Sequence, residues 1–254
     1  MRPLILISND DGYSAEGIQS LIQILRGTGD LIVVAPDSAR SGASLSITNT
    51  TPVKYNKISE EPGLTIYSCT GTPCDCVKLA LDYLVPRRPD LIVGGINHGD
   101  NAATNAHYSG TIAITIEGTL KGIPSVGFSS CAFKTREDFT RLKSPILNIV
   151  ERVLSQGLPP HVLLNVNFPA CEKFSGIRIC RMGMGDWYDE WTEREHPRGG
   201  KYYWIGGYFK GYDSDDEATD LWAIDHGYIA VTPITLDFTA YSAMSAIATT
   251  LSAE

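Results

Sequence analysis

Two carboxylates stand side by side where an apolar segment of the chain ends. The stretch LILISNDDG (4–12) passes from continuous aliphatic residues into Asn9, Asp10 and Asp11, with no basic residue beside them. Because adjacent negative charges repel each other, we expect a cation to lie between these carboxylates. Gly12 can adopt the backbone angles that turn both side chains inward.

Two further apolar runs also end in residues that carry oxygen ligands. LIVVA (31–35) leads into PDSARSGAS, which contains Ser41 and Ser44, and LIVGG (91–95) leads into INHGDN, which contains Asn97. Since ligands bind at the carboxyl ends of parallel strands, these side chains should meet the Asp10–Asp11 pair in one crevice. Carboxylate, hydroxyl and amide oxygens suit one Mg²⁺ or Mn²⁺ ion and suit zinc or copper poorly. Such an ion would polarise a phosphoryl group and activate a bound water as the nucleophile, which makes Asp10 and Asp11 the candidate catalytic residues.

The same crevice offers candidate contacts for a phosphate group. Ser109, Gly110 and Thr111 open a predicted helix, and the first turn of a helix binds anions through its free N–H groups. The turn around Gly42 adds further backbone N–H groups, and Asn9 is another candidate contact. These residues are therefore predicted to bind phosphate.

Each of these residues also has a plainer interpretation. Asp10 and Asp11 are of the type that shapes turns and caps helices, and Ser109 and Thr111 are ordinary helix caps. Ser41 and Asn97 are common in loops, as are His98 and His107. Oxygen-bearing side chains follow three different predicted strands, and their coincidence at one edge of the sheet favours the metal site over these alternatives.

The elements that must position these residues form an α/β fold. Several apolar runs are typical of buried parallel strands, and amphipathic segments between them predict helices on both faces of a mainly parallel sheet. The predicted strands are 4–8, 31–35, 91–95, 124–129 and 163–169. The predicted helices lie within 15–27, 76–84, 109–122 and from Thr135 to Gly157.

The pattern changes after Cys171 to short strands, aromatic residues and glycines. We expect an irregular β extension, then a strand within 227–239 and a short C-terminal helix with an apolar stripe of Met244, Ile247 and Leu251. No change of composition divides the chain. We expect one domain over 1–254, with an α/β core of about residues 1–170 and an extension with a C-terminal arm of about 171–254.

Composition excludes several classes of protein. The 254 residues are 43% hydrophobic and 20% charged, the profile of a globular protein, and the net charge of −8 argues against binding a nucleic-acid polymer. The N-terminal apolar stretch is too short for a secretory signal or a membrane span, so the cytoplasm is the expected location and no membrane contact is expected. The six cysteines lack the paired spacing of a zinc site and are expected to be structural thiols without disulfides.

The motifs in this chain resemble those of the survival protein E (SurE) family. NDDGYSAEGI, APDSARSGAS, GTPCDCV, GGINHGDN, YSGT, LLNVNFP and GYIAVTPITLDFTA occur in the family's order over nearly the whole chain. The resemblance implies a Rossmann-like core and a metal-dependent phosphomonoesterase that acts on nucleoside 5′- and 3′-monophosphates. It also implies homodimers or homotetramers built through swapped C-terminal segments, and it places the metal ligands at Asp10, Asp11, Ser41 and Asn97. Two positions depart from the family pattern. Cys74 stands where the family commonly has alanine, and SGTIAITIEG has larger apolar residues than the small ones usual in the family.

Two other functions remain as alternatives. A haloacid-dehalogenase-type phosphatase also begins with a strand that ends in aspartates, but it uses the first Asp of D-x-D-G as a covalent nucleophile. Here Asn9 occupies that position, and an amide cannot form an aspartyl-phosphate. A nucleotide-binding or sensing module would instead bind a nucleoside monophosphate with metal and release no phosphate.

Overall fold

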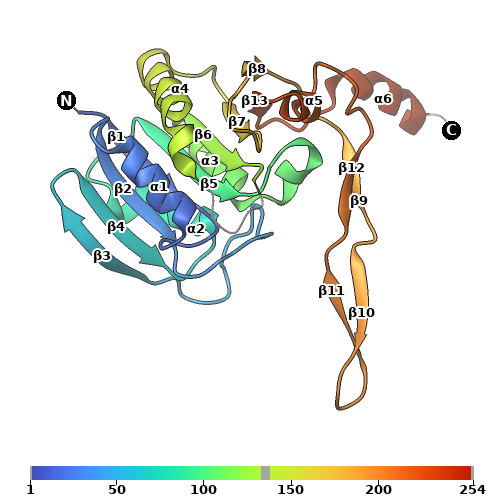
Figure 1. Ribbon diagram of the computed structural model, residues 1–254, viewed down its shortest axis with the longest axis horizontal. Coiled ribbons are helices and arrows are strands. Elements are labelled where there is room, and N and C mark those ends of the chain that lie inside the picture. The colour runs from blue at the N-terminus through green and yellow to red at the C-terminus, as the bar shows by residue number, and fades with distance from the viewer. Residues whose placement is uncertain (1, 133–137, 253–254) are drawn as a thin grey trace.

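A nine-stranded sheet forms the centre of the computed structural model, which describes residues 2–132 and 138–252 (Figure 1). The strand order is β3-β4-β2-β1-β5-β6-β7-β13-β8, in which β4 to β7 run parallel while β3 and β13 run antiparallel to β4 and β7. The strands are β1 (Leu4–Ser8), β2 (Asp30–Pro36), β3 (Tyr55–Glu61), β4 (Leu64–Cys69), β5 (Leu91–His98), β6 (Ser125–Ser130), β7 (Val162–Phe168), β8 (Gly176–Ile179) and β13 (Tyr228–Thr235). The predicted α/β class with a mainly parallel sheet is confirmed.

The sheet changes its direction of growth at β1. From β1 the chain builds outward through β2 and β4, then returns to place β5 on the other side of β1, with Ile5 opposite Leu91. In open α/β sheets a crevice forms at such a point, beyond the carboxyl ends of the two strands. The residues that follow β1 and β5 therefore face each other.

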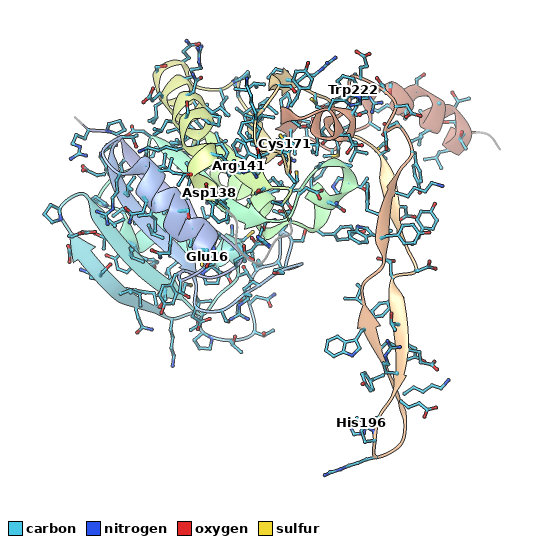
Figure 2. All side chains as sticks on the ribbon, in the orientation of Figure 1. Glu16, Asp138, Arg141, Cys171, His196 and Trp222 are labelled. Carbon is cyan, nitrogen blue, oxygen red and sulfur yellow. The ribbon has the colours of Figure 1, made fainter. Side chains whose placement is uncertain are left out.

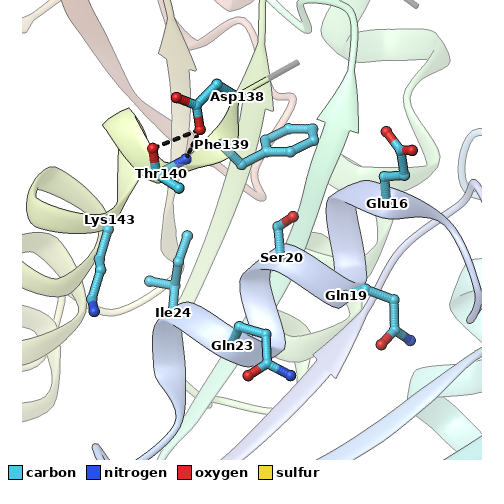
Figure 3. A pocket seen from close by; sticks show the side chains of 9 residues that line it. All are labelled: Glu16, Gln19, Ser20, Gln23, Ile24, Asp138, Phe139, Thr140 and Lys143. Atoms are coloured by element: carbon cyan, nitrogen blue, oxygen red, sulfur yellow. Dashed lines mark hydrogen bonds between the residues drawn. The ribbon is translucent and has the colours of Figure 1, made fainter. Parts of the chain in front are cut away.

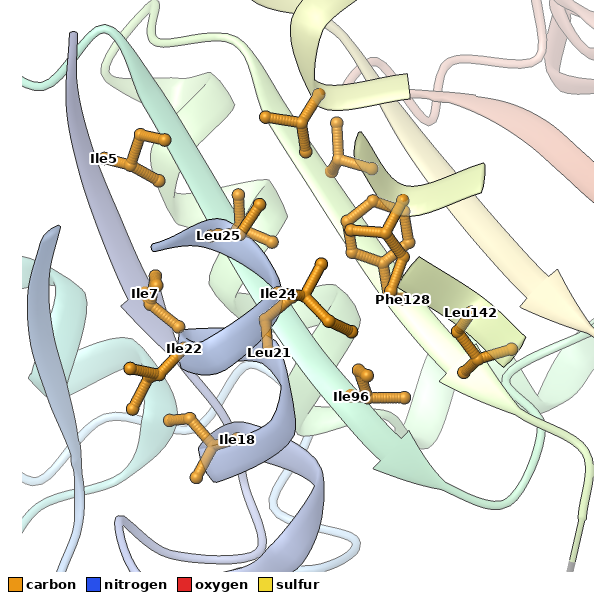
Figure 4. Close-up of a cluster of buried hydrophobic side chains, with 14 of the residues drawn as sticks. Ile5, Ile7, Ile18, Leu21, Ile22, Ile24, Leu25, Ile96, Phe128 and Leu142 are labelled. Carbon is orange, nitrogen blue, oxygen red and sulfur yellow. The ribbon is translucent and has the colours of Figure 1, made fainter. Parts of the chain in front are cut away.

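Helices cover both faces of the sheet. The helices α1 (Glu16–Leu25) and α4 (Lys143–Gln156) bury their apolar sides on one face, around Ile5, Ile7 and Phe128 (Figure 4). The helices α2 (Pro73–Leu79) and α3 (Gly110–Leu120) cover the other face, over Leu4 and Leu6. The remaining helical elements are the π-helix η1 (Ala80–Leu84), the 3₁₀-helices η2 (Ala103–Tyr108), η3 (Phe139–Leu142) and η4 (Tyr241–Ala243), and the helices α5 (Asp220–Asp225) and α6 (Met244–Ser252).

Three local features differ from the sequence prediction or lie beyond it. The helix predicted at 76–84 begins at Pro73, because Thr72 and Asp75 form a reciprocal capping box that stabilises an earlier start. The strands β3 and β4 were not predicted. The helix start predicted at Thr135 lies outside the described residues, and the described helical segment there begins with η3.

An arm of two short β-ribbons projects from the sheet (Figure 1). The strand β9 (Gly185–Tyr188) pairs with β12 (Tyr208–Gly211), and β10 (Trp191–Glu195) pairs with β11 (Lys201–Ile205). His196 lies at the far end, and the side chains along the arm stand clear of the core (Figure 2). This arm is the predicted irregular β extension, although β8 and β13, which also follow Cys171, belong to the main sheet.

The C-terminal helix α6 has no buried residue. Its predicted apolar stripe is exposed to solvent, with 57% of Met244, 55% of Ile247 and 81% of Leu251 accessible. The helix therefore does not bury its apolar stripe against the described part of its own subunit. Among residues 2–132 and 138–252, none covers this stripe.

No helix in the described part of the chain is long and apolar enough to cross a membrane. Four of the cysteines, Cys69, Cys74, Cys76 and Cys180, are buried.

Gly17 allows α1 to approach β5 closely, next to Asn97. A Cβ atom at this position would lie 2.0 Å from the carbonyl oxygen of Ile96, so an alanine must push the helix away from the strand. We predict that Gly17→Ala lowers the free energy of unfolding by about 1–3 kcal/mol, as overpacking does elsewhere. Urea unfolding measures this. Gly206→Ala is the control, because no atom lies within 4 Å of a Cβ there, and equal stability of the two variants would contradict the prediction.

Candidate active site

Asn9 closes the turn that carries the two aspartates. Its side-chain Nδ2 donates to the carbonyl of Gly12 at 2.9 Å, and the backbone N–H of Gly12 donates to Asn9 Oδ1 at 3.2 Å. Gly12 has a φ of +100°, which an L side chain rarely adopts. Asn9 is fully buried and uses both ends of its amide in this turn. Its observed role is to shape the turn, and the phosphate contact suggested for it stays a prediction.

Asp10 lies against the first turn of α3. Thr111 Oγ1 donates to Asp10 Oδ1 at 2.8 Å, and the backbone N–H of Gly110 also bonds to the carboxylate. A Cβ at position 110 would meet Asp10 Cβ at 2.6 Å, so only glycine permits this approach. Ser109 acts as the helix cap, since its Oγ accepts from the N–H of Ile112 at 3.1 Å. Ser109 thus caps the helix, and its predicted phosphate contact stays a prediction, whereas Gly110 and Thr111 contact an aspartate.

Asp11 faces the end of β5. The backbone N–H of His98 bonds to its carboxylate, which joins the loops that follow β1 and β5. Asn97 is half-buried beside this contact, and its Nδ2 donates to the carbonyl of Gly99 at 2.9 Å. With the amide nitrogen held in this way, the amide oxygen is the end of the side chain that remains for a ligand.

The loop after β2 reaches the site through backbone contacts. The N–H of Arg40 donates to the carbonyl of Asp10 at 2.7 Å, and a turn closed by Ala43 N–H to Arg40 O at 3.0 Å presents Ser41 and Gly42 to solvent. Ser44 Oγ donates to the carbonyl of His107 at 2.6 Å, which ties this loop to η2. Ser41 thus follows directly the residue that is bonded to Asp10.

The two carboxylates carry a large electrostatic cost in the absence of a cation. Burial, and next the negative charge of Asp11, raises the pKa of Asp10 to about 6, although Thr111 and Gly110 partly offset this. Burial also raises the pKa of Asp11, and His98 acts against it. Among the described residues, no Lys or Arg forms an ion pair with either carboxylate.

The donor set fits a divalent cation that prefers oxygen. Two carboxylates, the Asn97 amide oxygen and the Ser41 hydroxyl are hard ligands of the kind that bind Mg²⁺ and Mn²⁺. Within residues 2–132 and 138–252, no three His, Cys, Asp or Glu side chains gather as a transition-metal site would require. The burial of Asp10 and Asp11 without a cationic side chain makes a bound ion the simplest means of neutralising them.

A buried asparagine network supports the loop after β5 and was not predicted. The backbone N–H of Asn101 donates to Asn167 Oδ1 at 2.8 Å, and Asn101 Nδ2 donates to Ser129 Oγ at 2.7 Å. Asn165 Nδ2 donates to the backbone carbonyl of Asn101 at 2.7 Å. These side chains are almost fully buried. The sequence signal was present in LLNVNFP, where two polar residues alternate within an apolar run.

Asp220 anchors the same loop from far along the chain. It is fully buried, and its carboxylate accepts from the N–H groups of Ala103 at 2.9 Å and Gly183 at 2.8 Å. Ala103 begins η2, the segment that leads into α3. Asp220 lies 117 residues after Ala103 in the sequence, and no local sequence pattern indicates that the two residues are in contact.

A hollow in the described surface lies away from these residues. It has a volume of about 650 Å³ and is lined by α1 together with Asp138 and residues of η3 and α4, as Figure 3 shows. The helices α1 and α4 cover the face of the sheet opposite α3. None of the predicted site residues lines this hollow.

Comparison with known proteins gives a consistent result. Residues 5–189 match the family described as survival protein SurE. The chain is 54% identical to the 5′-nucleotidase SurE of Phocaeicola vulgatus over 96% of this chain and 95% of the relative. It is 49% identical to the 5′-nucleotidase SurE of Bacteroides thetaiotaomicron over 94% and 93%. The crystal structure of the SurE protein from Aquifex aeolicus superposes with a TM-score of 0.83 and 36% identity, covering 98% of this chain and all of that one.

The raised pKa of Asp10 predicts how stability depends on pH. Because the folded chain holds the Asp10 proton more tightly than the unfolded chain, the stability it contributes is present below about pH 4 and is lost as the pH rises through about 6. In chelator at pH 8, Asp10→Asn should raise the free energy of unfolding by about 1–3 kcal/mol, and the gain should shrink towards pH 5.

Urea unfolding at the two pH values measures this effect. Asp215→Asn, which removes an exposed loop carboxylate, is the charge-matched control. If Asp10→Asn does not raise the free energy of unfolding at pH 8, or if the control raises it equally, then ionised Asp10 does not destabilise the metal-free fold.

Proposed function

The chain belongs to the survival protein SurE family, and on this premise we propose that it hydrolyses nucleoside 5′- and 3′-monophosphates to nucleoside and phosphate. The observation that carries this proposal is the pair of aspartates at the crevice between β1 and β5, with Asp10 in contact with the N-terminus of α3. The related proteins named 5′-nucleotidase cover nearly the whole chain, so the chain is a phosphoric monoester hydrolase of this kind.

One divalent ion per subunit, Mg²⁺ or Mn²⁺, is the proposed cofactor. Asp10, Asp11, Asn97 and Ser41 would hold it, through two carboxylates, an amide oxygen and a hydroxyl. When bound, the ion supplies positive charge that stabilises phosphate oxygens and lowers the pKa of a bound water. The burial of the two aspartates with no basic partner in the described chain supports this proposal.

The residues of α3 and the Gly42 turn would bind the phosphate of the substrate. The first turn of α3 directs the N–H of Gly110 and the hydroxyl of Thr111 towards Asp10, and the positive end of the helix dipole favours an anion there. Ser109 fixes this first turn by capping it. Gly42 has a φ of +75° in an exposed turn, so its N–H is accessible to phosphate oxygens, while Asn9 fixes the turn that carries the aspartates.

Asp11 is the better placed of the two aspartates to orient or deprotonate the attacking water. Asp10 is nearly fully buried and is bonded to Thr111 and Gly110. Asp11 is only partly buried, so it is more accessible to solvent than Asp10 is. We therefore assign Asp10 mainly to holding the ion, and Asp11 to both tasks.

Phosphate release tests the function and separates it from a module that only binds nucleotide. Nucleoside 5′- and 3′-monophosphates should release phosphate with Mg²⁺ or Mn²⁺ and not with chelator. Asp10→Asn and Asn97→Ala should lower kcat/KM by about 100-fold or more, as expected for lost metal ligands. Asp215→Asn should keep the wild-type rate. Release that continues in chelator would contradict the metal mechanism, and binding of AMP without release would identify a sensing module.

We further propose that the subunits form a homodimer or homotetramer held by the C-terminal helix. A nine-residue helix gains little stability by itself, so α6 requires a packing partner. Its exposed stripe of Met244, Ile247 and Leu251 suits burial against a second copy of the chain. Phe238 and Tyr241, on the segment that leads into α6, are also exposed. The cytoplasmic location suggested by the sequence stays a prediction.

Substitutions in α6 test this assembly. The double variant Ile247→Lys with Leu251→Lys, or deletion of residues 241–254, should reduce the mass in solution to that of a monomer, because charges cannot be buried unpaired in an interface. Activity should fall mainly through lost stability. Ser245→Lys with Thr249→Lys places the same charges on the opposite side of the helix and should leave the mass unchanged. Light scattering during size-exclusion chromatography decides, and an unchanged mass in both double variants would show that α6 does not hold the subunits together.

A further inference from the structure

The motif GTPCDCV (71–77) contains a buried carboxylate, Asp75, to which the proposed chemistry gives no role. Asp75 closes the capping box of α2, where it accepts the N–H of Thr72 at 2.9 Å. The backbone N–H of Thr48 also donates to both of its oxygens, at 3.2 and 3.1 Å. Asp75 thus binds a second segment of the chain, 27 residues earlier in the sequence.

This second segment is continuous with the turn that carries Ser41. The N–H of Ala43 donates to the carbonyl of Arg40 at 3.0 Å, and the N–H of Ser46 donates to the carbonyl of Ala43 at 3.1 Å. The two hydrogen bonds close two consecutive turns, and Ser41 lies in the first of them. Since the N–H of Arg40 donates to the carbonyl of Asp10 at 2.7 Å, one end of this pair of turns is fixed at the candidate active site.

The other end of the two turns is fixed by the start of α2. Thr72 Oγ1 donates to the carbonyl of Ser46 at 2.7 Å, two residues before the bond between Thr48 and Asp75. A series of hydrogen bonds therefore leads from the backbone of Asp10 through the Ser41 turn to Asp75.

The backbone between these two ends needs support from outside. Gly42 has a φ of +75° and Ser44 a φ of +49°. The left-handed conformation is unfavourable for serine, so Ser44 adopts it only where surrounding contacts hold the chain. The bonds at the start of α2 supply such contacts, together with the bond from Ser44 Oγ to the carbonyl of His107.

The charged form of Asp75 makes these contacts. Burial alone would raise the pKa of Asp75, but hydrogen bonds from Thr48 and Thr72 outweigh it, and the pKa lies below its ordinary value. Hydrogen bonds to an ionised acceptor are stronger than those between neutral groups. Asp75 is therefore a firm attachment point for the loop near neutral pH.

We propose that Asp75 is a positioning residue, which fixes the loop after β2 through Thr48 so that Ser41 is held at the metal site. The proposal rests on the proposed function, because Ser41 is assigned there as a metal ligand. It gives Asp75 no contact with the ion or the substrate. The motif GTPCDCV then serves the reaction by holding a ligand that lies more than thirty positions earlier in the chain.

Metal binding tests the proposal. In Asp75→Ala the Kd for Mn²⁺, measured by calorimetric titration, should rise about tenfold, as expected when the support of a metal ligand is lost. Thr48→Pro should give a similar rise, because proline has no N–H to donate while Thr72 and Asp75 still cap α2. Asp138→Ala is the matched control, since it removes the carboxylate that caps η3 by accepting the N–H of Thr140, and it should leave the Kd unchanged.

The two variants together separate the loop from the helix cap. A rise in Kd with Asp75→Ala but not with Thr48→Pro would assign the effect to the cap of α2 and overturn the proposal. An unchanged Kd in a folded Asp75→Ala protein would overturn it as well.

A double-mutant cycle shows whether Asp75 acts through Ser41. Ser41→Ala removes the ligand that the loop positions, so adding Asp75→Ala to this variant should not raise the Kd for Mn²⁺ further. A second rise of about tenfold, equal to the effect in the wild-type background, would contradict the proposal, because Asp75 would then act on the ion by another route.

Amide hydrogen exchange examines the loop in metal-free protein. The amides of Ala43 and Ser46 should exchange about tenfold faster in Asp75→Ala than in the wild type, and at the wild-type rate in Asp138→Ala. Equal exchange in all three proteins would show that the loop keeps its conformation without Asp75, against the proposal. If the wild-type protein binds no Mn²⁺, the proposed metal site fails, and the exchange rates still decide whether Asp75 fixes the loop.

Discussion

The contact between the Asp10 carboxylate and the first turn of α3 determines the arrangement of the whole site. Thr111 and Gly110 bind the carboxylate from one side, and the backbone of Asp10 accepts the N–H of Arg40 from the other. One residue at the end of the central strand thus fixes both the helix and the loop after β2. Asp11 then fixes the end of β5 through His98.

Burying the Asp10 carboxylate against α3 requires close packing and satisfied hydrogen bonds in the surrounding fold. Close approach of backbone to side chain is possible only because Gly110 lies against Asp10 and Gly17 lies against β5. The buried amides of Asn101, Asn165 and Asn167 bond to one another and so support the loop before η2. The raised pKa of Asp10 shows that this carboxylate is not fully compensated within the chain, and the cation that we propose would lower this pKa.

Sequence patterns predicted the strands and candidate site residues that a short stretch of the chain defines by itself. Continuous apolar runs identified β1, β2 and β5, and the rule that ligands gather at parallel strand ends selected Asp10, Asp11, Ser41 and Asn97. The strand β3 was missed because it is an edge strand exposed throughout, with Lys57, Glu60 and Glu61 in place of an apolar alternation. Asp220 and the asparagine network were missed because their partners are distant in sequence, and nothing in a local window indicates which buried amide meets which loop.

The position of β13 in the sheet has a consequence for the order in which the molecule can be completed during synthesis. The strand inserts between β7 and β8, so β8 must wait some fifty residues for its neighbour to leave the ribosome. Asp220, the acceptor for Ala103, emerges just before it. A nascent chain can therefore form the parallel strands up to β7, bring Asp10 to α3 and form the asparagine network, yet the bond from Ala103 to Asp220 must wait until Asp220 has been made. A loop that follows β5 thus gains its final hydrogen bond from a residue made more than a hundred positions later.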